Sequence, residues 1–215
     1  MPEVLTTAAL IAALEHADSS AALLTATQAL AAAAGDDQAA ITTLVQVLGF
    51  NNPGAAVAAV DGLIAIGPAA VDPLLHNLDV HNYGARAWAV RALAGIGDVR
   101  GLELLEQALG DDIGASVRRA AARGLGQLQL LGLEGPLREA VIERCLQALE
   151  AGGGDDEWVV RYAVVVGLES LARTMEGDAD QLQRTYSALS QLAAEAGEPT
   201  PVVRLRASLA LRRLP

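Results

Sequence analysis

The chain has no lysine, one cysteine and few aromatic residues. All 15 basic residues among its 215 are arginine, and 26 acidic residues bring the formal net charge to −11. Because an acidic surface repels phosphate, we expect no nucleic-acid partner. The lone Cys145 cannot form a disulfide within the chain, which fits a reducing cytoplasm.

Long apolar runs are also missing. Hydrophobic residues make up 52% of the chain, but no stretch reaches the ~20 uninterrupted apolar residues that a transmembrane helix needs. The opening Met1-Pro2-Glu3 places no basic region before an apolar segment, so we expect no secretory signal. We therefore expect a cytoplasmic protein without membrane insertion.

The sequence repeats itself with a period of about 30 residues. Gly54–Gly67 resembles Gly84–Gly97, and related copies follow further along the chain. Each copy spaces its apolar residues three and four positions apart, which predicts one buried stripe of a helix. An arginine preceded by valine or alanine marks the start of four copies, at Arg86, Arg118, Arg161 and Arg204.

A second amphipathic helix precedes each copy, and glycines (Gly35, Gly67 and Gly97) stand where helices should end. Two-helix repeats of this length predict an α-solenoid, and the valine-arginine signature is that of HEAT repeats in the short form also called PBS-lyase repeats. We expect an all-α HEAT-like superhelix of about six helix pairs in one domain, residues 1–215. The expected helices that open the pairs are Ala39–Leu48, Ala69–Leu78, Gly101–Leu109, Leu137–Leu149 and Asp180–Ala194, after a degenerate first pair in Leu5–Ala34.

No motif of a stand-alone enzyme is present. His16, His76 and His81 have no cysteine or acidic partner at metal-ligand spacing, so we predict no metal site. Gly152-Gly153-Gly154 lacks the preceding strand and the following lysine of a phosphate loop. Cys145 lies among apolar helix residues and is interpreted as core. The sequence therefore assigns no catalytic residue.

The repeated arginines allow two interpretations. They form either a ladder for anionic groups or hydrogen bonds within the stack, and the structural interpretation is favoured because this arginine usually has that role in HEAT repeats. Asp98, Asp111 and Asp112 are the candidate acceptors.

A different column of residues predicts a binding groove. Asp61, Arg91 and Arg123 occupy equivalent positions on three successive second helices, off the core stripe. The arginines suit carboxylates, the aspartate suits ring N–H groups, and an aromatic side chain suits stacking on a flat conjugated ligand. An internal Asp–Arg network or a protein-binding face explains the column equally well. The candidate groove residues are Asp61, His81, Tyr83, Trp88, Arg91 and Arg123.

A family resemblance rests on four segments. These are Leu48–Ala56 (LGFNNPGAA), Asn82–Ala87 (NYGARA), Arg91–Leu93 (RAL) and Ser116–Ala121 (SVRRAA). Through them the chain resembles the F subunit of the E/F-type phycobilin lyases.

The resemblance implies a function. Such proteins pair with a homologous E-type subunit in the cyanobacterial cytoplasm and attach phycocyanobilin, a linear tetrapyrrole, through a thioether to a cysteine of the phycocyanin alpha subunit. The bilin is a transferred ligand, and the lyase acts by holding it in a reactive pose. Relatives that also isomerise the bilin carry a His-Cys motif where this chain reads Asn51-Asn52-Pro53-Gly54, so we expect attachment alone.

Two other functions compete with the lyase hypothesis. One is a non-catalytic HEAT-repeat adaptor or chaperone that acts on phycobiliproteins during assembly or turnover. The other is a DNA-binding HEAT enzyme, against which the net charge of −11 argues.

Overall fold

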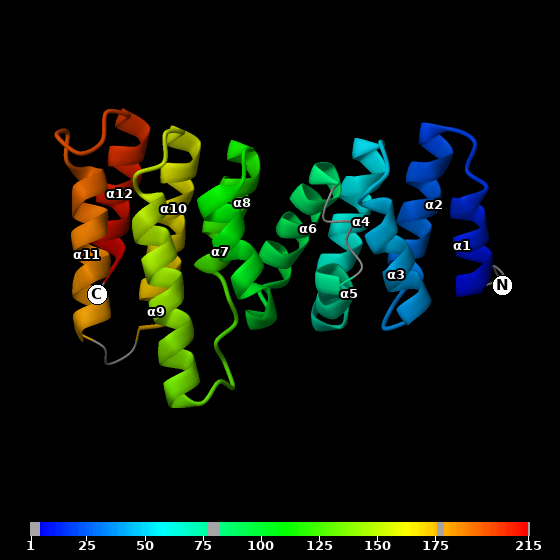
Figure 1. Cartoon of the computed structure of the whole chain (residues 1–215), viewed down its shortest axis with the longest axis horizontal. Coiled ribbons are helices and arrows are strands. Elements are labelled where there is room, and N and C mark those ends of the chain that lie inside the picture. Colours follow the sequence, from blue (N-terminus) through cyan, green and yellow to red (C-terminus); the bar gives the residue numbers. More distant parts are fainter. Residues whose placement is uncertain (1–4, 77–81, 176–178, 215) are drawn as a thin grey trace. The chain divides into compact units, whose positions relative to one another are not determined.

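The structure, a computed structural model, describes residues 5–76, 82–175 and 179–214. Within these ranges the chain is all-helical, with twelve α-helices and two short 3-10 helices (Figure 1). The contacts divide the chain into two compact units, Met1–Asp98 and Val99–Pro215. Three helix pairs make up each unit, so the predicted all-α repeat fold and its six pairs are confirmed. One domain over residues 1–215 stays a prediction.

Unit 1 consists of two helix layers. The second helices of its pairs pack side by side, α2 on α4 and α4 on α6, and the first helices pack as α1 on α3 and α3 on α5. Leu30, Leu44, Leu63 and Leu93 are almost fully buried between the layers. The elements are α1 (Thr7–Glu15), α2 (Ser20–Ala33), α3 (Gln38–Val47), α4 (Pro53–Ile66), η1 (Gly67–Ala70), α5 (Val71–His76) and α6 (Tyr83–Ile96).

Unit 2 repeats the same arrangement. Here α10 packs between α8 and α12 in one layer, and α9 packs between α7 and α11 in the other. Leu105, Leu125, Leu146 and Leu168 are fully buried. The elements are η2 (Val99–Gly101), α7 (Leu102–Asp111), α8 (Ala115–Leu125), α9 (Gly135–Gly152), α10 (Trp158–Ala172), α11 (Ala179–Ala193) and α12 (Pro201–Arg213).

The ends of the helices follow from local sequence. Asn52 and Asn82 cap α4 and α6, because each side-chain oxygen accepts a hydrogen bond from the backbone N–H three residues on, at 3.1 and 3.0 Å. At the other ends Gly67 and Gly97 have φ values of 77° and 73°, which residues with a side chain rarely adopt. The predicted glycine helix ends are thus confirmed.

The segment Pro53–His76 has the length and mean hydropathy of a membrane-spanning helix. In the structure it is not one straight helix, since it is made of α4, η1 and α5. Val60, Leu63 and Leu74 are buried within unit 1. Its apolar character is therefore explained by its place in two successive repeats.

Candidate functional site

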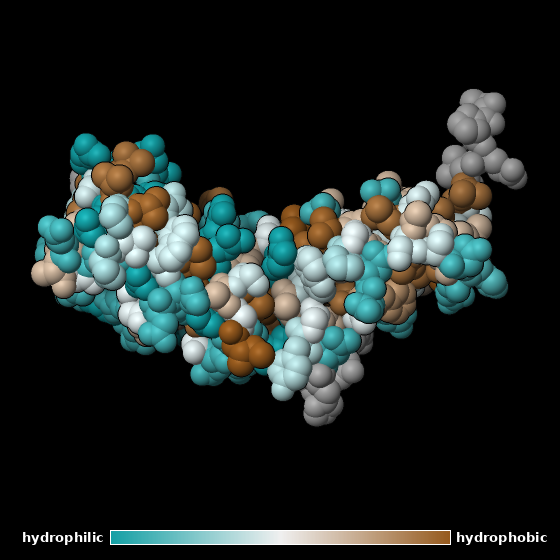
Figure 2. Space-filling model, turned by 90° about the horizontal axis from the view of Figure 1, so that it is seen from above, coloured by the Kyte–Doolittle hydropathy of each residue, from teal (hydrophilic) through white to brown (hydrophobic). Residues whose placement is uncertain are grey.

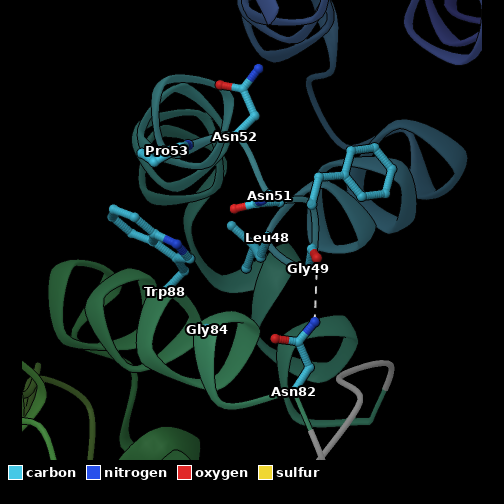
Figure 3. Close-up of a pocket in the computed structure, with 9 residues that line it drawn as sticks. Leu48, Gly49, Asn51, Asn52, Pro53, Asn82, Gly84 and Trp88 are labelled. Carbon is cyan, nitrogen blue, oxygen red and sulfur yellow. Dashed lines mark hydrogen bonds between the residues drawn. The ribbon is translucent and has the colours of Figure 1, made fainter.

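A pocket of about 350 Å³ opens in unit 1 between the loop before α4 and the start of α6 (Figure 3). Two of the segments that carry the family resemblance, Leu48–Ala56 and Asn82–Ala87, supply most of its wall, although they are far apart in the sequence. Its lining residues are Leu48, Gly49, Phe50, Asn51, Asn52, Pro53, Asn82, Gly84 and Trp88.

Two asparagines hold this pocket together. The side-chain oxygen of Asn82 caps α6, and its side-chain nitrogen donates a hydrogen bond to the carbonyl oxygen of Gly49 at 3.3 Å. Asn52 does the same one repeat earlier, donating to the carbonyl oxygen of Ser20 at 3.1 Å. Each asparagine thus caps its own helix and ties it to the preceding repeat. Asn51 is exposed, and its amide has no hydrogen-bond partner among the described residues.

Trp88 lines the unit 1 pocket, and Arg91 lies next to it on α6. The guanidinium carbon of Arg91 lies 4.9 Å from the centre of the Trp88 ring, a cation–π contact. Trp88 extends from α6 toward the loop before α4, and its ring borders the pocket (Figure 3). Because Arg91 is exposed and forms no ion pair with any described residue, its charge is available to an anionic ligand.

The other predicted groove residues are less closely associated. Asp61 is exposed on α4, at the turn equivalent to that of Arg91, and the two form no ion pair. The internal Asp–Arg network, one of the interpretations of this column of residues, is therefore not formed between Asp61 and Arg91. Tyr83, the first residue of α6, is 71% exposed. Arg123 belongs to α8 of unit 2, and His81 lies outside the described residues.

The repeat arginines of unit 2 are occupied within the stack. Arg118 donates two hydrogen bonds to the carboxylate of Asp155, at 2.6 and 3.0 Å. Arg161 makes the same fork to Glu198, at 2.6 and 2.9 Å. Arg204 donates to the carbonyl oxygen of Glu198 at 2.9 Å. Each arginine thereby stabilises a loop between the paired helices.

The carboxylates that bind Arg118 and Arg161 are not among the expected acceptors. Asp155 and Glu198 each lie in the next repeat, three residues before the first residue of its second helix, whereas Asp112 contributes its backbone carbonyl to Arg118 at 2.8 Å. Arg86 holds the equivalent position on α6 and is partly buried.

A second pocket, not predicted from the sequence, lies in unit 2. It measures about 330 Å³ and is lined by Arg119, Trp158, Val159, Tyr162 and Val202. Hydrophobic residues are exposed in several places on the surface (Figure 2). Of the residues that line this pocket, Trp158 is 45% exposed and Val202 is 43% exposed. The sequence signal that could have indicated this pocket is the four-residue spacing of Trp158 and Tyr162, which places both aromatic side chains on one face of a helix.

The lone thiol and the acidic residues offer no further chemistry. Cys145 is fully buried in α9, and burial raises its pKa to about 12. Such a thiol is not nucleophilic near neutral pH. Within the three described ranges, no group of three His, Cys, Asp or Glu side chains is placed to hold a metal ion.

Comparisons with known proteins agree with this fold. A family model described as HEAT repeats matches residues 41–126 and 71–169. The chain is 57% identical to the phycocyanobilin lyase subunit beta of Pseudanabaena tenuis over 76% of its own length, and spans 57% of that relative. It is 54% identical to the phycocyanin alpha phycocyanobilin lyase CpcF of Synechocystis, with 76% of each chain covered.

A solved structure extends the likeness to three dimensions. In the complex of CpcE and CpcF of phycocyanin lyase from Nostoc, one chain is 40% identical, with a TM-score of 0.72. The match covers 81% of the present chain and 99% of that chain. This chain belongs to the family of CpcF-type phycocyanobilin lyase subunits, which are built from HEAT repeats.

Proposed function

We propose that the chain is one subunit of a heterodimeric lyase. With a homologous E-type partner it attaches phycocyanobilin through a thioether to a cysteine of the phycocyanin alpha subunit, in the cyanobacterial cytoplasm. The observation that carries the proposal is the unit 1 pocket, whose wall is made by two family-resemblance segments beside Trp88 and Arg91. A tetrapyrrole with propionate groups suits an aromatic ring next to a free guanidinium.

Different side chains in and beside the unit 1 pocket bind different parts of the bilin. Trp88 stacks on a pyrrole ring, and Arg91 binds a propionate with two parallel hydrogen bonds. Asn51 and Asp61, both exposed, are placed on the neighbouring loop and helix to accept hydrogen bonds from pyrrole N–H groups. These contacts fix the bilin while the acceptor protein approaches, which is catalysis by proximity and orientation.

The bond-forming step needs no nucleophile from this chain. The acceptor's thiol adds across a carbon–carbon double bond of the bilin: the C–S bond forms, the π bond is lost, and the thiol proton moves to the adjacent carbon. Nothing is oxidised or reduced. Because the segment Asn51-Asn52-Pro53-Gly54, most of which lines this pocket, has neither histidine nor cysteine, attachment without isomerisation is proposed.

Co-expression tests the function directly. The chain is produced with an E-type subunit, the phycocyanin alpha subunit and a source of phycocyanobilin, and the alpha-subunit band is examined for bilin fluorescence after denaturing electrophoresis. We expect a fluorescent band that disappears when this chain is omitted. If another F-type subunit restores fluorescence with the same partner and this chain does not, the lyase proposal fails, and binding to phycobiliprotein without bond formation would indicate an adaptor or chaperone.

Substitutions of Trp88 and Arg91 test the unit 1 pocket. Arg91→Gln removes a charge-assisted carboxylate contact, so we expect transfer to slow about ten-fold, with Trp88→Leu at least as slow. Trp88→Phe keeps a ring and should retain most activity. The matched control is Arg212→Gln, because Arg212 is also an exposed helix arginine. Unchanged transfer by Arg91→Gln/Trp88→Leu, at normal helix content, would rule out this pocket.

A further inference from the structure

The unit 2 pocket combines aromatic, aliphatic and cationic side chains from three neighbouring helices. Trp158 and Tyr162 lie one turn apart on α10, Arg119 faces them from α8, and Val202 closes the far side from α12. These positions lie near the starts of the second helices, the same end of the repeat that forms the pocket of unit 1. Both pockets include a tryptophan from a second helix, Trp88 in unit 1 and Trp158 in unit 2.

The arginines beside this pocket differ in whether they are paired. Arg118 is bound to Asp155, whereas its neighbour Arg119 is exposed and has no hydrogen bond or ion pair with any described residue. Arg123, one turn further along α8, is exposed and equally without a partner in the described part of the chain. Two positive charges one turn apart on a helix repel each other, and a ligand with two negative groups removes that repulsion.

Two of the helices that line the pocket, α8 and α10, make a close backbone contact. Gly126 and Gly167 allow these helices to approach so closely that a Cβ on Gly126 would lie 2.7 Å from the carbonyl carbon of Gly167. This backbone contact holds together the two helices that supply Arg119 and Trp158. A preformed pocket binds a rigid, flat ligand with little cost in side-chain ordering.

We propose that this surface is a second tetrapyrrole-binding site. Trp158 and Tyr162 contact the faces of pyrrole rings, and Arg119 and Arg123 bind the two propionates. At about 330 Å³ the pocket is near the lower end for small-molecule sites, so it accommodates part of the bilin and leaves the remainder on the α8 surface. The inference rests on the proposed function for the identity of the ligand.

Titration of the full-length chain with phycocyanobilin and with its dimethyl ester tests this inference. The background variant Trp88→Leu leaves Trp158 as the single tryptophan, so its fluorescence reports binding. We expect the free acid to bind at least ten-fold more tightly than the ester, because the ester cannot form ion pairs. Arg119→Gln/Arg123→Gln should lose this preference and leave binding of the ester unchanged.

The controls separate the possible outcomes. Arg212→Gln and Leu131→Ala change an exposed arginine and a 99% exposed leucine of unit 2 outside the pocket, and both should bind like the background. Equal affinity for acid and ester, or an unaltered preference in the double arginine variant, would overturn the proposal. The proposal would also be overturned if the double arginine variant no longer bound the E-type subunit but kept its affinity for the bilin. That result would assign the surface to protein contact. A chain that shows the carboxylate preference but never supports transfer would retain this site and lose the lyase function.

Discussion

Alanine in place of Gly126 is expected to destabilise unit 2 by about 1–3 kcal/mol. Gly126 has ordinary helical backbone angles, so the cost is steric: the new Cβ would collide with the Cα and the carbonyl oxygen of Gly167 on α10. Both obstacles are backbone atoms, which cannot rotate away as a side chain can. The two helices must separate, with loss of packing along their length. Urea denaturation followed by circular dichroism measures the change.

Gly110 provides the matched control for this substitution. It lies within α7 of the same unit, and a Cβ added there would meet no atom within 4 Å. Gly110→Ala should stabilise the helix by about 0.5–1 kcal/mol because alanine loses less conformational freedom. Opposite signs for two chemically identical changes would locate the effect at the α8–α10 contact. Equal effects would show that α8 and α10 are not closely packed at Gly126.

Arg161→Ala is expected to cost about 3–5 kcal/mol at neutral pH, since it removes one partner of a buried ion pair. The Glu198 side chain is 0% exposed and receives two hydrogen bonds from Arg161. Without the guanidinium, a carboxylate remains buried with its charge uncompensated. Arg144→Ala is the control: it breaks an equally bidentate pair with Glu106 whose arginine is 50% exposed, and it should cost at most about 1 kcal/mol.

The same ion pairs predict a pH dependence. Hydrogen bonds from Arg161 hold the pKa of Glu198 below its ordinary value, and those from Arg118 lower the pKa of Asp155. A depressed folded-state pKa contributes stability above the unfolded-state pKa, and this is lost as the pH falls through the folded value. Wild-type stability should therefore decline below about pH 4.5, and the cost of Arg161→Ala should shrink over the same range. A cost independent of pH would contradict this account of Glu198.

Sequence patterns predicted the helices because the determinants of a helix are local. The apolar stripe, the asparagine caps and the terminal glycines all lie within a few residues of the elements that they define. The observed ends of the first helices agree with the expected ones to within three residues, apart from the expected end at Leu78, which lies outside the described residues. The Trp88–Arg91 contact was predictable for the same reason, since residues three apart share a helix face.

Contacts between repeats were harder to predict. The candidate acceptors for the repeat arginines were near them in sequence, but Arg118 reaches Asp155, 37 residues away. The unit 2 pocket unites Arg119 with Trp158 and Tyr162 from the next pair. Neither association has a local signature, because each depends on how consecutive pairs stack. The resemblance segments Leu48–Ala56 and Asn82–Ala87 were recognised separately, and the structure shows that they share one pocket.

The buried thiol has a consequence for a protein that handles an electrophile. A bilin that adds to cysteine would also modify its own carrier if that carrier displayed a reactive thiolate. Cys145 is enclosed in α9 with its pKa raised to about 12, and the chain has no lysine amine as a substitute nucleophile. Under the proposed function, neither Cys145 nor a lysine of this chain competes with the acceptor cysteine for the bilin, and we expect covalent colour in a transfer mixture on the acceptor or the partner subunit.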